Sequence, residues 1–314
     1  MIIFTHKSGL SPTDTEDLWN DNVRIRRSGY LTDLLGHHTV DLVQSCVEDG
    51  RPFLISLHFT APHWPWEGPE DEAEARRLKS LFHYDGGSQR TYQKMVQQMD
   101  LQIGRVLRAL DAASAAENTI VIFTSDNGGE RFSDTWPFTG RKTELLEGGL
   151  RVPAVIRWPG QLFAGVASEQ VTIGMDWFPT LLAAAGAAPD PAFPPDGIDL
   201  LPLLTQASAP LPRKLFWRYK LHGQRAMRDG DWKYLKILDN AFLFDVAART
   251  SMTRLVAEWE EWNASMLPLD PQSFTHGFTG AELAHHFGVT RADGWDLAEP
   301  RIASSTSRSR SLPK

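Results

Sequence analysis

The sequence predicts an α/β fold in which helices flank a mostly parallel central sheet, followed by a smaller C-terminal antiparallel sheet and a helix. Two short apolar runs, at residues 53–59 and 120–123, end in turn residues, which is typical of strands buried in a parallel sheet. A helical pattern precedes each run, so helix and strand alternate along the first half of the chain. From residue 215 onward, strand-like runs separated by turn sequences predict an antiparallel meander.

Two helices are expected in the first half of the chain. Residues 33–47 place apolar side chains on one helical face, and Asp49-Gly50 ends that helix. Residues 92–112 form the clearest helical pattern, because apolar residues recur there at spacings of three and four. The apolar positions of this second helix are Val96, Met99, Ile103, Val106 and Leu110.

Two oxygen-bearing side chains follow the second predicted strand. Asp126 and Asn127 come after the run at residues 120–123, and a further strand is expected at residues 152–158. Open α/β sheets place their chemistry in loops at the carboxyl ends of strands. The carboxylate and the amide both offer oxygen to a hard cation such as Ca²⁺ or Mg²⁺. A simple turn is the alternative interpretation, because aspartate, asparagine and glycine also favour turns.

Two candidate anion-binding side chains lie in related loops. His63 stands between two prolines, directly after the run at residues 53–59, and Lys142 lies farther along the loop that begins at Asp126. Histidine and lysine suit a tetrahedral oxyanion, since both donate hydrogen bonds and both can carry positive charge. A structural loop histidine and a solvated surface lysine are the alternatives. Two oxygen ligands are also fewer than the about six to eight that Ca²⁺ takes.

The second half begins with a helix expected at residues 175–185, which Gly186 would end. Residues 186–212 are rich in proline, alanine and aspartate, so we expect them to link two units. The strands of the meander are expected at residues 215–219, 224–228, 232–238 and 242–246. A helix from Thr253 follows, and the serine- and arginine-rich residues 301–314 are expected to be a disordered tail.

Composition excludes several classes of protein. The 314 residues are 42% hydrophobic and 23% charged, as in soluble globular proteins. The net charge of -7 argues against nucleic acid as a main partner, because no global positive field attracts phosphates. No run approaches the roughly 20 apolar residues of a membrane span. Cys46 is the sole cysteine, so the chain forms no internal disulfide.

Several motifs in this order resemble the sulfatase family of the alkaline phosphatase-like superfamily. They are the loop Thr60-Ala61-Pro62-His63-Trp64-Pro65, the loop Ser125-Asp126-Asn127-Gly128, and the segment from Gly140-Arg141-Lys142 to Glu147-Gly148-Gly149. Tyr30-Leu31-Thr32-Asp33 and the meander fit the same pattern, so the similarity extends to about residue 270. Several motifs that agree in order are a stronger signal than any one of them.

The resemblance implies an alkaline phosphatase-like fold and an arylsulfatase-like sulfuric ester hydrolase, acting on a sulfate monoester of a small molecule or a carbohydrate. It implies that Asp126 and Asn127 bind Ca²⁺, with Mg²⁺ as the alternative ion. It also implies that His63 and Lys142 contact the sulfate oxygens as catalytic residues. The implied domains are residues 1–185 (partial catalytic domain), 186–212 (linker), 213–300 (antiparallel subdomain) and 301–314 (tail).

The family's nucleophile is a formylglycine made from the first residue of a Cys/Ser-x-Pro-x-Arg motif, and this sequence contains no such motif. Cys46 lacks both the proline and the arginine, and Ser208 has a second proline in place of the arginine. The family's first metal-binding aspartates and its Gly-Lys-x-His motif are also missing. We therefore expect a C-terminal portion of a sulfatase that exposes apolar sheet surface, is poorly soluble, and does not turn over a sulfate ester by itself.

Two other function classes remain open at this point. One is a hydrolase of phosphate or phosphonate esters from the same superfamily, and the other is a non-catalytic remnant that binds anions or a partner. Localisation is also open. The chain as written starts without a signal peptide and is expected in the cytoplasm, but an export signal in a missing N-terminal part would change that.

Overall fold

The computed structural model describes residues 18–73, 87–206, 209–244 and 252–268. The expected tail at residues 301–314 and the end of the expected C-terminal subdomain lie outside them. Elements of the first half are β1 (Leu18–Asn20), β2 (Val23–Ile25), α1 (Leu31–Glu48), α3 (Gln89–Ala112), β3 (Val121–Thr124), α4 (Glu147–Leu150), β4 (Ala154–Arg157) and α5 (Trp177–Ala184). Elements of the second half are α6 (Leu201–Thr205), β5 (Lys214–Tyr219), β6 (Gln224–Asp229), β7 (Trp232–Ile237), β8 (Asn240–Phe244) and α7 (Met252–Ala264).

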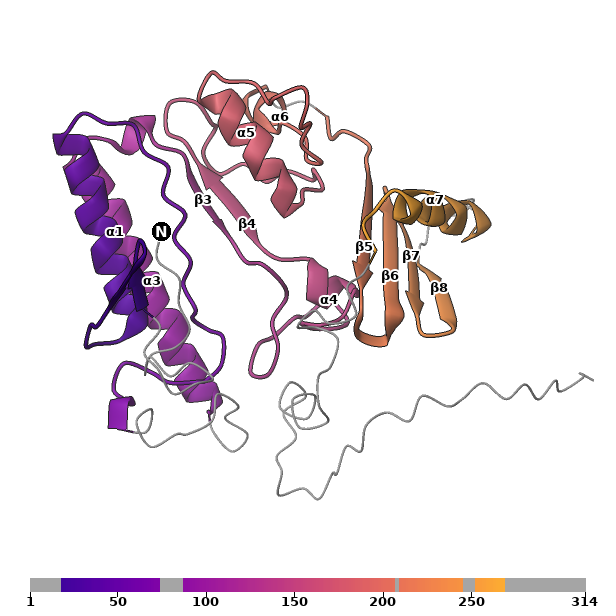
Figure 1. The fold of residues 1–314 in the computed structure, drawn as a ribbon, viewed down its shortest axis with the longest axis horizontal. Coiled ribbons are helices and arrows are strands. Elements are labelled where there is room, and N and C mark those ends of the chain that lie inside the picture. The colour runs from indigo at the N-terminus through magenta and orange to yellow at the C-terminus, as the bar shows by residue number, and fades with distance from the viewer. Residues whose placement is uncertain (1–17, 74–86, 207–208, 245–251, 269–314) are drawn as a thin grey trace, which may run out of the picture.

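These elements form three groups in space (Figure 1). α1 and α3 lie side by side, and the β3–β4 ribbon lies next to them with α5 and α6 at one end. The β5–β8 sheet stands beyond α4, with α7 packed against it. Within the described ranges, none of the helices is both long and apolar enough to cross a lipid bilayer.

The two predicted helices of the first half are confirmed, and they run in the same direction. Asp33, near the start of α1, accepts a hydrogen bond of 2.5 Å from Gln102 Nε2, and farther along Val43 packs against Ala109. Gly36 permits this close approach, because a Cβ atom there would lie 2.4 Å from the Gln102 side chain.

The buried face of α3 differs from the one that the apolar spacing predicts. It includes Met95, Gln102 and Ala109, whereas among the predicted apolar positions Leu110 alone is fully buried. Gln102 is buried although it is polar, because Asp33 supplies a partner from the neighbouring helix. Hydrophobic periodicity does not detect a polar pair of this kind.

Residues 53–59 are extended but do not form a strand, which corrects the sequence prediction. Phe53, Ile55 and Val121 pack against one apolar cluster of α1 and α3, so this segment and β3 start from the same end of the helix pair. Leu54, on the opposite face, is 80% exposed. The alternating pattern thus specifies an extended backbone with one buried face, but no strand pairs with it in the described part of the chain.

β3 and β4 pair antiparallel, so the mostly parallel central sheet is not confirmed. Ile122 pairs with Ile156 and Phe123 pairs with Val155. A parallel pair needs a crossover connection, usually a helix, whereas the four-residue α4 is too short to serve as one. Phe123 and Val155 are 40% and 59% exposed, which leaves one face of the ribbon open to solvent.

The predicted meander and final helix are confirmed. β5, β6, β7 and β8 form one antiparallel sheet in sequence order, and α7 covers one of its faces. Met227, Tyr234 and Trp259 form the buried cluster between the sheet and α7. On the opposite face, Ala226 packs against Leu145, which lies just before α4. The sheet therefore stands between α7 and the segment that leads into α4.

A buried ion pair joins the start of α5 to the start of β5. Two guanidinium nitrogens of Arg213 donate to the two carboxylate oxygens of Asp176 at 2.6 and 3.0 Å. Asp176 is fully buried and also accepts the backbone N–H groups of Ile173 and Ile198. Gly186 adopts a φ of +74° just after α5, which agrees with the predicted end of that helix.

Replacing Arg213 by methionine should destabilise the protein by about 3–5 kcal/mol, because Asp176 then keeps a buried charge without its cationic partner. Urea unfolding followed by circular dichroism measures this loss. Arg51→Met is the matched control, since Arg51 and its partner Asp49 are both exposed and the variant should keep the wild-type midpoint. Equal urea midpoints for both variants would show that the Arg213–Asp176 ion pair does not stabilise the contact between α5 and β5.

Candidate functional site

The loop that carries His63 is anchored on the helix pair. The backbone N–H of His63 donates to the Thr60 carbonyl at 2.8 Å, which closes a tight turn. Ala61, inside that turn, and Trp66, after it, form a buried cluster with Met95 of α3. The stiff proline-bracketed loop is therefore fixed at both ends by packing.

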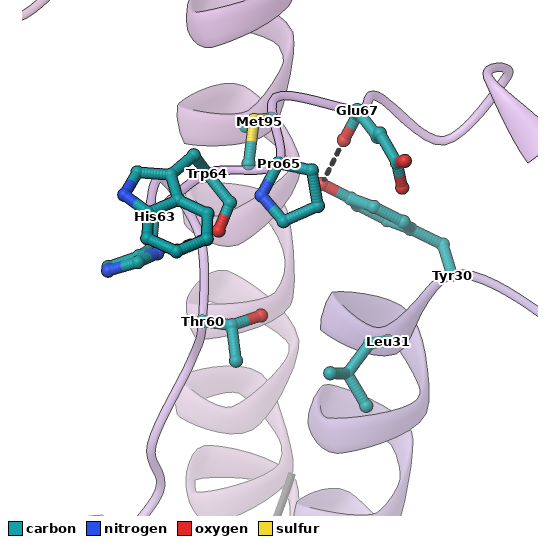
Figure 2. Close-up of a pocket in the computed structure, with 8 residues that line it drawn as sticks. All are labelled: Tyr30, Leu31, Thr60, His63, Trp64, Pro65, Glu67 and Met95. Atoms are coloured by element: carbon teal, nitrogen blue, oxygen red, sulfur yellow. Dashed lines mark hydrogen bonds between the residues drawn. The ribbon is translucent and has the colours of Figure 1, made fainter. Parts of the chain in front are cut away.

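A small pocket lies behind this loop, where it meets the start of α1 (Figure 2). The Tyr30 hydroxyl donates to the Glu67 carbonyl at 2.9 Å. Burial is the main cause that raises the pKa of Tyr30 to about 12, so the hydroxyl keeps its proton. In Figure 2 the His63 ring lies on the far side of the loop from Tyr30 and Leu31. The pocket thus lies where the loop is anchored, and His63 is one of the residues that line it.

The pKa of His63 lies below its ordinary value. Although the side chain still reaches solvent, desolvation by the surrounding chain is the main cause, and the positive charge of Lys142 is the next. A 2.7 Å hydrogen bond to the Trp64 carbonyl and the charges of Glu130 and Asp126 act in the opposite direction. Because a carbonyl only accepts, Nδ1 carries the proton of the neutral ring, and Nε2 keeps its lone pair.

These electrostatic interactions place His63, Lys142 and Asp126 in one neighbourhood, as their positions after the apolar runs led us to expect. Asn127 belongs to the same place, because its amide donates to Asp126 Oδ2 at 2.5 Å. Ser125 Oγ donates to the Asn127 carbonyl at 3.1 Å and tightens the turn. The structure therefore places Lys142 and Asp126 within electrostatic range of His63, and Asn127 beside Asp126.

Glycine contacts hold the loop that joins Asp126 to α4. A Cβ atom on Gly128 would lie 1.8 Å from the carbonyl oxygen of Gly148, and one on Gly148 would lie 2.1 Å from that of Gly140. The N–H of Gly128 also donates to Gly149 at 2.8 Å. These positions admit only glycine, since any side chain would meet backbone that cannot move aside. The start and the end of the loop are thereby locked together.

Lys142 is held at the centre of this loop. Its backbone N–H donates to the Gly129 carbonyl at 2.9 Å, next to the Asp126–Asn127 turn. On its other side, Thr143 and Leu145 are hydrogen-bonded by Gln224, the first residue of β6. The sequence gives no signal for Gln224, because it lies 81 residues from Thr143.

Asp126 and Asn127 offer the type of ligand that a hard cation prefers, but fewer ligands than such an ion takes. Their oxygens are of the type that Ca²⁺ and Mg²⁺ prefer. Among the described residues, no group of three or more His, Cys, Asp and Glu side chains is arranged to hold a metal ion. The loop is therefore a partial set of ligands for such an ion.

Glu147 connects α4 to the C-terminal sheet. Lys233 Nζ donates to one carboxylate oxygen at 2.7 Å, and Arg228 lies 3.5 Å from the other. Burial raises the pKa of Glu147, but the hydrogen bond and the charges of these two cations outweigh it and lower the pKa overall. Lys233 is nearly buried, and its desolvation outweighs the attraction of Glu147, so its pKa is also lowered. The pair thus orients α4 more than it stabilises the fold.

Comparisons with known proteins identify the relatives of this chain. A family model described as Sulfatase matches residues 5–187. The chain is 28% identical over 217 residues to the uncharacterized sulfatase YdeN of Escherichia coli (strain K12), an alignment that covers 68% of this chain and 38% of that protein. It is 34% identical over 181 residues to the N-acetylgalactosamine-6-sulfatase of Canis lupus familiaris, covering 55% and 32%.

Among solved structures, Ps i-CgsB superposes with a TM-score of 0.71 at 26% identity, over 91% of this chain and 66% of that chain. A protein of the alkaline phosphatase superfamily from Vibrio parahaemolyticus superposes with a TM-score of 0.51 at 16% identity, over 77% of this chain and 56% of that chain, which concerns the fold alone. The chain spans about a third of the length of the curated relatives named above.

Replacing Lys142 by methionine should raise the pKa of His63, because it removes a positive charge that disfavours the imidazolium. An NMR pH titration of the ring, assigned with a His63→Gln variant, measures the change. In the wild type the midpoint should lie below about 6.5, the ordinary value for histidine. Arg141→Met is the control and should leave the midpoint in place. The proximity of Lys142 to His63 would be refuted by identical titrations of the wild type and Lys142→Met.

Proposed function

We propose that this chain, which belongs to the sulfatase family, supplies the sulfate-binding part of a sulfuric ester hydrolase site. Its solved relatives have the alkaline phosphatase-like fold, and one of them, Ps i-CgsB, superposes over 91% of this chain. The observation that carries the proposal is the convergence of Lys142 and His63 beside Asp126 and Asn127. Two potentially cationic groups attract the oxygens of a sulfate ester, and an oxygen-rich loop can hold a metal cation that does the same.

In this proposal the two basic side chains, Lys142 and His63, have different roles in binding the ester. Lys142 attracts the sulfate group with a fixed positive charge. His63 is neutral in the free chain, with its Nδ1 proton committed to the Trp64 carbonyl. The negative oxygens of a bound ester favour the imidazolium, so His63 gains a proton at Nε2 and donates it in a hydrogen bond to an ester oxygen.

Asp126 and Asn127 are proposed as ligands of Ca²⁺, with Mg²⁺ as the alternative. When bound, such an ion offsets negative charge on the transferring group. Because Ca²⁺ takes about six to eight oxygens, the remaining ligands would come from water, from the ester, or from polypeptide outside the described residues. The two side chains alone are expected to bind Ca²⁺ weakly.

The proposed substrate is a sulfate ester of a carbohydrate or of a small molecule. The relative from Canis lupus familiaris carries the name N-acetylgalactosamine-6-sulfatase, and the solved structure of Ps i-CgsB has been determined in complex with k-i-k-neocarrahexaose. No Cys/Ser-x-Pro-x-Arg motif occurs in the 314 residues, so we propose that this chain binds and orients the ester without turning it over. The absence of that motif also supports a second candidate, a non-catalytic anion-binding protein.

The 314-residue chain should bind inorganic sulfate, and Lys142→Met should weaken binding by about tenfold or more, the value of one charge-assisted hydrogen bond. Isothermal titration calorimetry measures both affinities, with Arg141→Met as the control. Hydrolysis of 4-nitrophenyl sulfate should be undetectable. Tighter binding of inorganic phosphate than of sulfate would favour a phosphate or phosphonate ester hydrolase instead. Turnover of the aryl sulfate would refute the proposal that this chain binds the ester without hydrolysing it.

Calcium should bind weakly through Asp126, and Asp126→Ala should abolish the effect of Ca²⁺ on the thermal midpoint, because the carboxylate is the charged ligand. Differential scanning calorimetry with and without Ca²⁺ measures this. Asp134→Ala removes an exposed carboxylate farther along the same loop and is the matched control. A Ca²⁺ response that survives in Asp126→Ala would remove the loop from any metal site.

A further inference from the structure

The loop that carries Lys142 is bound on one side by a single buried side chain of the C-terminal sheet. Gln224 is 2% exposed, and both polar atoms of its side-chain amide, Nε2 and Oε1, make hydrogen bonds. Nε2 donates to the Thr143 carbonyl at 2.8 Å and to the Leu221 carbonyl at 3.1 Å, and Oε1 accepts the Leu145 N–H at 2.9 Å. The amide thus occupies the place that a neighbouring strand would take beside residues 143–145.

The backbone that Gln224 holds is strained. Thr143 has a φ of +72°, in the left-handed region that β-branched residues rarely adopt. Such a conformation costs about 1–3 kcal/mol and persists only where the surroundings enforce it. Lys142 directly precedes this residue, so the direction in which its side chain leaves the loop depends on the restraint at Thr143. The hydrogen bond from Lys142 to Gly129 fixes the other side.

The two faces of β6 contact different parts of the protein. Ala226 contacts the loop at Leu145, and Arg228 on the same face approaches Glu147. Met227 points to the opposite face, into the cluster under α7. Because side chains alternate along a strand, the loop contacts can be altered on one face while the other stays intact. This alternation provides a matched control within a single strand.

We propose that Gln224 is a positioning residue for the anion site, which holds the backbone at Thr143 and Leu145 and thereby keeps Lys142 beside His63. This inference rests on the proposed function for its meaning, but its geometry does not depend on it. The competing role is purely structural, in which Gln224 satisfies buried backbone groups and Lys142 would stay in place without it. The two roles differ in what happens at His63.

The test compares Gln224→Met with Met227→Ala in the full chain. Methionine preserves length and apolar volume but removes all three hydrogen bonds, whereas Met227→Ala opens a cavity on the far face of the same strand. Thermal midpoints measure the general loss of stability in both. The NMR titration of His63 and calorimetric binding of inorganic sulfate then measure the position of Lys142.

Gln224→Met should shift the His63 titration upward, toward that of Lys142→Met, and weaken sulfate binding by about tenfold, as the loss of one charge-assisted contact would. Met227→Ala should lower the thermal midpoint yet leave both site measurements at wild-type values. The proposal is overturned when Gln224→Met lowers the midpoint while His63 titrates as in the wild type. It is equally overturned when Met227→Ala shifts the titration as much as Gln224→Met.

A second variant covers the case in which Gln224→Met does not fold. Gln224→Asn keeps a polar amide in the buried position, but its shorter side chain cannot reach Thr143 and Leu145 together. The same upward shift is expected, and a wild-type titration in a folded Gln224→Asn contradicts the proposal. If the wild type itself binds no sulfate, the proposed function fails, whereas the titration still decides the role of Gln224.

Discussion

The candidate site depends on how closely two stretches of backbone approach each other at Gly128 and Gly148. With a Cβ atom on Gly128 only 1.8 Å from the opposing carbonyl, the contact is possible for glycine alone. It closes the long connection between β3 and β4 into a loop whose two ends touch. Because Asp126 precedes one end and Lys142 lies inside the loop, this backbone contact decides that an oxygen donor and a cation share one neighbourhood.

Closing the loop also affects the pKa of His63. The ring is partly desolvated and stands near Lys142, and both effects disfavour the imidazolium. A site that keeps one fixed cation and one neutral imidazole avoids placing two positive charges side by side before an anion arrives. In the proposed function, a bound anion would supply the negative charge that allows the imidazole to take up its second proton. The charges of Asp126 and Glu130 act in the opposite direction and favour the imidazolium, although the pKa of His63 is lowered overall.

The sequence predicts the local elements well and the pairing between them poorly. α1, α3 and the meander follow from periodicity and turn residues, and the rule that chemistry follows strand ends grouped His63 with Asp126. Prediction from the sequence fails at residues 53–59 and at β3–β4, because an apolar run specifies an extended backbone but not the strand that it pairs with. Gln224 is out of reach for a different reason. A buried amide 81 residues from its partner leaves no local pattern in the sequence.

Long-range contacts of this kind make the C-terminal sheet a part of the site rather than an appendage. The boundary expected at residues 186–212 separates two units by composition, yet Gln224 and Lys233 reach across it to the loop and to α4. A flexible attachment would leave Thr143 free to relax from its strained conformation, since nothing within the loop bonds its carbonyl among the contacts described. Gln224 supplies that restraint, since it is buried and is hydrogen-bonded to both Thr143 and Leu145. The restraint on Thr143, next to Lys142, therefore comes from Gln224, a residue of the β5–β8 sheet on the other side of the boundary expected at residues 186–212.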